Sequence, residues 1–205
     1  MASLIMHLVV SDIIKKKFAL SDKYLLGSVL PDVFDKVNMT RKESHYLDCK
    51  GPETPNITKF IEANKNRLKD EVTLGYLSHL IEDKVWYNSF ITRYIKELMI
   101  DQQEVIYIKD NSVHPIEDFW NTMYKDYDQI DRYLCEKYKI NIEEYQLRIS
   151  NFLDDPELKN KLDEILYLRE IDSKREMEFV TQKDIKQYID MATMEVNAIL
   201  NKYID

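Results

Sequence analysis

The residues of this 205-residue chain whose types and spacing best suit chemistry are His79 and Asp83, which lie four positions apart. On an α-helix this spacing places both side chains on one face, about 6 Å apart along the axis, so that both can bind one cation. Without further ligands, such residues more often form a simple ion pair. The sequence around His79 is mostly apolar, and polar groups in such a setting need a partner. The pair is therefore a candidate metal site.

Three upstream residues have the same chemistry. His7 interrupts an apolar segment, Asp32 directly follows Pro31, and His45 lies in the sequence Ser-His-Tyr. Each has an ordinary alternative: a hydrogen-bonded core histidine, an aspartate in a turn and a surface histidine. Together with His79, however, they place three of the four histidines within the first 79 residues, each beside apolar sequence. Zinc sites combine imidazole and carboxylate ligands in a shaped, water-poor cavity, and these residues match that combination.

The order of these residues resembles that of the bacterial zinc-dependent phospholipase C-like family. After His7, the shared motifs are L-L-G-x-x-x-P-D at residues 25–32, S-H-Y at 44–46, G-Y-x-x-H-x-x-x-D-x-x-W at 75–86 and Y-x-D-Y at 124–127. The last motif is similar to a segment of small intracellular members. The resemblance covers roughly residues 1–138. It implies an all-α multi-helix bundle of the zinc-dependent phospholipase C type that hydrolyses phosphodiesters.

Carried over residue by residue, the resemblance implies up to two zinc sites. The first would be bound by Asp32, His45, His79 and Asp83, and the second by His7, with Asp83 bridging the two ions. A bridging carboxylate holds paired metals about 3.5–4 Å apart. A zinc-bound water with its pKa lowered toward about 7 would attack phosphorus, while Asp32 orients that water as a base. The substrate would be a small phosphate ester or a phospholipid-like molecule.

The chain also departs from the secreted members of that family. It lacks their additional histidine after the H-x-x-x-D motif and their later H-x-x-x-E motif. With no signal peptide to remove, we also expect no mature N-terminal amine as a metal ligand. We therefore expect one or two zinc ions, or other divalent metals, instead of three. Asp126 and His114 are candidate substitutes, although His114, in a polar segment before Pro115, also suits an ordinary surface position.

The composition excludes several other classes of protein. Only 3 residues are glycine, and no glycine-rich phosphate-binding motif of dinucleotide-binding or P-loop proteins occurs. The same shortage disfavours a β-sandwich, whose tight turns need glycine. The net charge of −8 disfavours nucleic-acid binding, which needs a basic surface. Cys49 and Cys135 lie far apart, which argues against a disulfide framework or a cysteine zinc ribbon.

The N-terminal segment is fairly apolar, but it does not have the order of a signal peptide. Its positive charges, at Lys15–Lys17, follow the apolar residues instead of preceding them. No apolar run reaches the roughly 18 residues of a membrane span. We therefore expect a cytoplasmic protein without a transmembrane segment.

The elements that must position these residues are predicted to be helices, because 44% of the residues are hydrophobic and 32% are charged. Periodicity and capping residues predict helices at 3–18, 21–30, 57–68, 70–99 and 115–138, and then helices that begin after Asn141, Asp155 and Thr181. Pro31 should end the second helix and leave Asp32 just beyond it. Residues 100–112 alternate enough for a short strand or hairpin. We expect residues 1–140 to form the metal-binding helical domain and the helices of 141–205 to pack on it.

All three glycines, Gly27, Gly51 and Gly75, lie in the half that carries the candidate ligands. We expect the backbone there to bend or to approach a neighbour closely. The later helices, without glycine, would serve as scaffold.

Two other classes of protein compete with a phospholipase C-like hydrolase, and the sequence disfavours the first of them. A helical phosphohydrolase of the HD type needs adjacent histidine and aspartate, and none of the four histidines is followed by aspartate. A non-catalytic helical protein could keep a metal for structure or bind a partner through its acidic surface. The four tyrosines within residues 124–138 could line a pocket for a choline-like cation, but core positions with hydroxyls near the surface explain them better.

Overall fold

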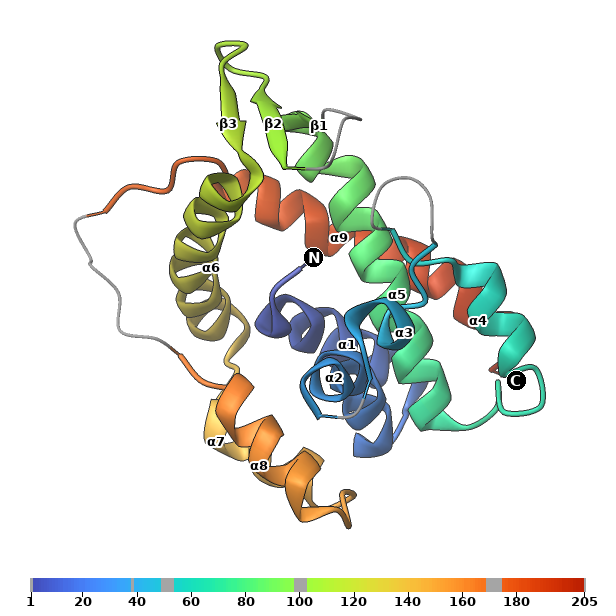
Figure 1. The fold of residues 1–205 in the computed structure, drawn as a ribbon. Coiled ribbons are helices and arrows are strands. Elements are labelled where there is room, and N and C mark those ends of the chain that lie inside the picture. Colours follow the sequence, from blue (N-terminus) through green and yellow to red (C-terminus); the bar gives the residue numbers. More distant parts are fainter. Residues whose placement is uncertain (1, 38, 49–53, 98–102, 169–174, 205) are drawn as a thin grey trace.

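The computed structural model describes residues 2–37, 39–48, 54–97, 103–168 and 175–204, which form a helical bundle with one small sheet (Figure 1). The helices in these ranges are α1 (Leu4–Phe18), α2 (Asp22–Val37), α3 (Arg41–Ser44), α4 (Ile57–Ala63), α5 (Glu71–Ser89), α6 (Ile116–Tyr138), α7 (Ile142–Ser150), α8 (Pro156–Ile165) and α9 (Gln182–Leu200). A short 3-10 helix, Ile91–Arg93, precedes the antiparallel sheet of β1 (Ile95–Glu97), β2 (Glu104–Tyr107) and β3 (Val113–Pro115).

The centre of the bundle is formed by α1, α2 and α5, with α9 packed against α1 and α5 and with α7 and α8 packed against α2. In Figure 1 the sheet projects at the top, and α7 and α8 lie at the bottom left. The prediction of a mostly helical fold is confirmed, and the sheet is the exception to an all-α fold. Its strand β2 lies in the segment expected to contain a strand or hairpin. Of the helices in the described ranges, none combines the length and apolar character that a membrane crossing requires.

Helices α2 and α5 touch backbone to backbone at Gly27 and Gly75. A β-carbon added at Gly27 would lie 2.0 Å from the carbonyl oxygen of Val72, and one added at Gly75 would lie 2.1 Å from that of Tyr24. Both distances are far below the roughly 3.5 Å of van der Waals contact, so neither position accepts a larger residue without movement of a helix. The expectation of close backbone approach is confirmed for these two glycines, whereas Gly51 lies outside the described residues.

Side-chain caps fix where the later helices begin. The Asn141 and Asp155 side chains accept backbone N–H groups from the first turns of α7 and α8. Thr181 and Asp184 form a reciprocal capping box at the start of α9. These caps satisfy N–H groups that have no partner within the helix. The predicted starts of all three helices are confirmed.

The prediction that Pro31 ends the second helix is wrong. α2 continues through it to Val37, so Asp32 lies within the helix and not beyond its end. Proline lacks the N–H that would make the usual intrahelical hydrogen bond. Val29 and Val33, two positions before and after Pro31, are completely buried in the core. Their packing holds the helical path in spite of the missing hydrogen bond.

The helix that carries His79 is also shorter than predicted. α5 ends at Ser89, whereas the sequence predicted that this helix would continue to about Met99. Beyond it, Ile95 is buried and pairs with Tyr107 of β2, so strand pairing takes apolar residues that helical periodicity had assigned to the helix. α4 likewise ends early, at Ala63.

Gly75→Ala should destabilise the protein by about 2 kcal/mol or more, because the added β-carbon must push α2 and α5 apart. At an ordinary helix position the same change would stabilise by up to about 1 kcal/mol, so the sign of the effect is informative. Urea unfolding of the variant and the wild type measures the difference. Lys84→Ala, at an exposed position of α5, serves as the control and should change stability by less than about 0.5 kcal/mol. A Gly75→Ala protein as stable as the wild type would contradict the close contact.

Candidate metal centre

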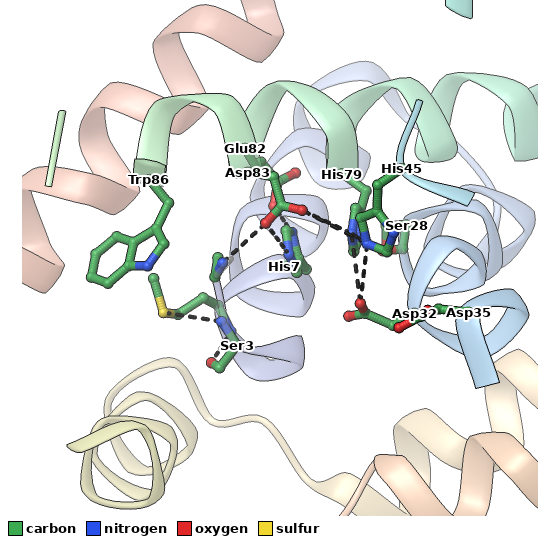
Figure 2. A network of polar contacts seen from close by, with 12 residues as sticks. Ser3, His7, Ser28, Asp32, Asp35, His45, His79, Glu82, Asp83 and Trp86 are labelled. Carbon is green, nitrogen blue, oxygen red and sulfur yellow. Dashed lines mark hydrogen bonds and ion pairs between the residues drawn. The ribbon is translucent and has the colours of Figure 1, made fainter. Parts of the chain in front are cut away.

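The five residues predicted as metal ligands meet in one cluster between α5 and the N-terminal helices (Figure 2). His7 comes from α1, Asp32 from α2, and His79 and Asp83 from α5, while His45 is the residue that ends α3. Two overlapping groups place one ligand atom of each residue within 4.8 Å of the others: His7, Asp32 and His79, and His45, His79 and Asp83. Buried histidines and aspartates in such groups could hold a metal ion.

Four ligand atoms of the cluster have the separations expected around a zinc ion. Nε2 of His45 lies 3.3 Å from Nε2 of His79 and 3.3 Å from Oδ1 of Asp32. Oδ2 of Asp83 lies 3.5 Å from Nε2 of His79 and 3.8 Å from Nε2 of His45. Nε2 of His79 lies 4.0 Å from Oδ1 of Asp32. Ligand atoms about 2.0–2.1 Å from a tetrahedral zinc ion are separated by about 3.3 Å. The observed distances equal or slightly exceed this value, so the donor set fits a zinc-sized cation.

Hydrogen bonds on the outer side of two imidazole rings determine which nitrogen faces the cluster. Nδ1 of His79 donates to the carbonyl oxygen of Ser28 at 2.8 Å. Nδ1 of His45 donates to the carbonyl oxygen of Arg41 at 3.2 Å and lies 2.7 Å from the hydroxyl of Ser44. Because a carbonyl oxygen can only accept, the neutral rings carry their protons on Nδ1 and their lone pairs on Nε2. The two lone pairs then face each other at 3.3 Å, an arrangement that a cation between them stabilises.

His7 is oriented by a buried glutamate that the sequence analysis did not identify. Nδ1 of His7 lies 2.8 Å from Oε2 of Glu82, and both side chains are fully buried. The ring of His7 also stacks on that of His79, with centroids 3.8 Å apart. The sequence did contain a signal, because Glu82 lies three residues after His79 and therefore on a neighbouring part of the same helix face. Carboxylates commonly orient metal-binding histidines through the ring nitrogen that does not bind the metal.

Asp83 lies between the two groups of ligands. Its Oδ1 lies 3.4 Å from Nε2 of His7 and accepts the backbone N–H of Ala2 at 3.0 Å. Its Oδ2 faces His45 and His79. One carboxylate oxygen therefore points to each group, as in carboxylates that bridge two metal ions. The arrangement can accommodate one cation among His45, His79 and their aspartates and a second beside His7.

Burial and mutual charge set the protonation states of the cluster. Burial alone would lower the pKa of His7, but its contacts with Asp83 and Glu82 outweigh this effect and raise the pKa to about 10. Burial raises the pKa of Glu82 to about 7. Burial also disfavours ionised Asp32 and Asp83, yet the neighbouring histidines outweigh it and lower both pKa values. Burial, followed by the charge of His7, lowers the pKa of His79. At neutral pH, ionised aspartates and a neutral His79 are in the states that bind metal.

Among the residues that the structure describes, three buried atoms of this network have no hydrogen-bond partner: Nε2 of His7, Oε1 of Glu82 and Oδ2 of Asp83. An unpaired buried polar atom costs about 1–3 kcal/mol, and more when the group is charged. Nε2 and Oδ2 are also the atoms that metals bind in histidine and aspartate. A cation in the cluster would satisfy them, which supports the fit of a metal to this donor set.

Asp126 and His114, the two candidate substitute ligands, do not join the cluster. Asp126 accepts the backbone N–H groups of residues 178–180 and pairs with Arg175 at 2.8 Å. His114 lies in β3, where its ring stacks on Tyr107 with centroids 4.0 Å apart. Asp126 therefore ties the segment before α9 to α6, and His114 is a partly exposed residue of the sheet.

A cavity of about 400 Å³ lies beside the cluster, and Asp32 forms part of its wall. The rest of the lining consists of residues 2–5, Asp35, Arg41, four residues of α6 and residues of the segment 164–168 at and beyond the end of α8. Two tyrosines of α6 also line it. Tyr127 is buried and its hydroxyl accepts the indole N–H of Trp86 at 2.7 Å, whereas Tyr124 is 49% exposed. The expectation of a core position therefore holds for Tyr127. Tyr124, in contrast, lines the cavity and is exposed to solvent.

Comparisons of the chain with protein-family models, curated proteins and solved structures found no match. The phospholipase C-like resemblance therefore rests on the sequence motifs. The case for a metal rests on the donor atoms, their distances and their burial.

Elemental analysis of the purified protein should find between one and two zinc ions per chain, and His79→Ala should lose at least one of them, because His79 belongs to both ligand groups. Chelation should lower the thermal midpoint of the wild type, since the metal binds the folded state. His114→Ala is the matched control, a histidine outside the cluster, and should keep its metal. A wild type that is folded and free of metal would contradict the metal site.

His7 carries a proton at neutral pH in the metal-free protein, because its pKa is raised to about 10, and it must release that proton to bind a metal. Zinc affinity at this group should therefore rise with pH up to that pKa, by as much as about tenfold per pH unit. Calorimetric zinc titrations at constant pH, in buffers with different ionisation enthalpies, measure the protons released. His7→Ala should release about one proton fewer. If the variant and the wild type released the same number, His7 would not be a ligand.

Proposed function

We propose that the chain is a zinc-dependent hydrolase of phosphate esters, similar in its chemistry to phospholipase C. The proposed metal ligands are His7, Asp32, His45, His79 and Asp83. The substrate would be a small phosphodiester or phospholipid-like molecule that reaches the ligand cluster through the cavity of about 400 Å³. A mixture of histidine and carboxylate ligands is typical of hydrolytic zinc sites.

One observation carries the proposal: Asp32 belongs both to the ligand cluster and to the cavity wall. Structural zinc sites are closed by protein ligands, whereas catalytic sites keep one position open to water and substrate. The side chain of Asp32 is 23% exposed, whereas those of His7, His45, His79 and Asp83 are fully buried. Among the five ligands, access from solvent is therefore by way of Asp32, on the side that faces the cavity.

The residues of the chain would have distinct roles in hydrolysis. A bound divalent cation would supply Lewis-acid chemistry, polarising a water molecule and the phosphoryl oxygens. Asp32, which is ionised and faces the cavity, would accept a hydrogen bond from that water and orient it toward phosphorus. The carbonyl oxygens of Ser28 and Arg41 keep two histidine rings in the orientation that exposes Nε2. The buried inner wall of the cluster would keep other water molecules away.

A non-catalytic metal is the second candidate, and the origin of the ligands favours it. They come from α1, α2, α5 and the end of α3, so a bound cation would also connect four elements of the core. Metal binding of this kind contributes directly to folding. The two roles differ at Asp32, because only a hydrolase needs that side chain for a reaction as well as for metal binding.

The zinc-loaded protein should hydrolyse at least one member of a panel of p-nitrophenyl phosphomonoesters and phosphodiesters. Asp32→Ala should lower the rate by at least about 100-fold, since it removes the residue that orients the water. Asp83→Ala should lose both metal and activity, because this carboxylate faces both ligand groups. Rates and zinc content are measured on the same samples.

Asp163→Ala, an exposed acidic position on α8, is the control and should retain the rate of the wild type. A zinc-loaded protein that is inert on the whole panel would contradict the hydrolase and favour the structural role.

A further inference from the structure

The cavity beside the metal cluster has a strongly asymmetric charge. Among the lining residues that the structure describes, one is cationic, Arg41, and five are carboxylates: Asp32, Asp35, Asp128, Asp131 and Glu164. An anionic phosphate that entered this cavity would be repelled by the carboxylates. A bound metal would offset this repulsion near Asp32. Of the lining residues named above, Arg41 is the one that can offset the repulsion elsewhere in the cavity.

Arg41 is placed by the same short helix that supplies a metal ligand. It is the first residue of α3, and His45 is the residue that ends this helix. The backbone carbonyl of Arg41 accepts the Nδ1–H of His45 at 3.2 Å, and Arg41 is also a lining residue of the cavity. The main chain of Arg41 thus orients a metal ligand, and its guanidinium pairs with Asp35, another residue of the cavity lining.

Arg41 makes a long ion pair with another residue of the cavity lining, Asp35. Its Nη1 lies 3.7 Å from Oδ2 of Asp35, which is longer than a hydrogen bond, and the Arg41 side chain is 37% exposed. A guanidinium has five N–H donors in a planar fork that matches two oxygens of a phosphate group. Asp35 lies three residues after Asp32 on α2, so this ion pair holds the guanidinium on the side of the cavity where the cluster is exposed.

We propose that Arg41 binds the phosphate group of the substrate and positions it against Asp32 and the metal cluster. This inference rests on the proposed function and adds a specificity-determining residue to it. The ligand class is a phosphate anion or phosphate ester, recognised by a bidentate guanidinium contact. A lysine at this position would supply the charge but not the planar fork, so Arg41→Lys should bind phosphate less well than the wild type.

The test is a calorimetric titration of inorganic phosphate into zinc-loaded protein, with zinc content measured before and after. Arg41→Met should raise the dissociation constant for phosphate by about tenfold or more, because charge-assisted hydrogen bonds are lost. It should leave zinc content unchanged, since the backbone carbonyl that orients His45 is retained. Lys42→Met is the matched control, because it removes the same charge from the same helix at an exposed position outside the cavity lining.

The control should keep the dissociation constant within about twofold of the wild type, because its charge is screened by solvent. An equal loss in both variants, no loss in Arg41→Met, or a wild type that does not bind phosphate would each overturn the inference. Circular dichroism checks the fold, and if Arg41→Met does not fold, Arg41→Lys replaces it with a smaller expected loss. A wild type without zinc would refute the proposed function, and repeating the titration on metal-free protein would still test Arg41 by itself.

Discussion

The contact between the backbones of Gly27 and Gly75 is the constraint on which the rest of the site depends. With no side chain at either position, α2 and α5 approach until a β-carbon would lie about 2 Å from the opposite carbonyl oxygen. This approach brings the carbonyl of Ser28, the next residue of α2, within 2.8 Å of Nδ1 of His79. It also places Asp32 of α2 beside the two histidine Nε2 atoms. A larger separation of the helices would remove the hydrogen bond and the ligand geometry together.

The second constraint is the burial of charge. Asp83, Glu82 and His7 are fully buried, and in the metal-free protein the imidazolium of His7 offsets the neighbouring carboxylates. This balance is incomplete, because Nε2 of His7 and Oδ2 of Asp83 find no hydrogen-bond partner within the described part of the chain. A buried network that is only partly satisfied is less favourable than either a complete network or an apolar core. These buried groups could hold a cation, and a bound cation would satisfy the two atoms.

The clustering of these histidines and aspartates could be predicted from the sequence better than the elements that carry them. His79 and Asp83 could be paired because helical spacing alone puts them on one face, and caps such as Thr181 with Asp184 are local signals. Pro31 misled the prediction because its local preference is outweighed by the packing of Val29 and Val33, which depends on distant residues. The end of α5 depends on the pairing of Ile95 with Tyr107, which local periodicity does not encode. The cavity and the position of Arg41 depend on how α3, α6 and α8 pack together. Short sequence motifs describe local structure and do not predict such packing.

The short helix α3 shows how these constraints combine. Four residues are too few to form a stable helix alone. α3 is held by the capping box of Thr40 with Glu43 and by the hydroxyl of Tyr76, which donates to the carbonyl of Ser44. Because Tyr76 follows Gly75 on α5, the helix that sets the crossing with α2 also fixes α3. The position of His45 at the cluster and that of Arg41 at the cavity are therefore not independent of each other. In this fold, a change that shifts α5 relative to α2 has to alter the geometry of the histidine–aspartate cluster and the cavity wall together.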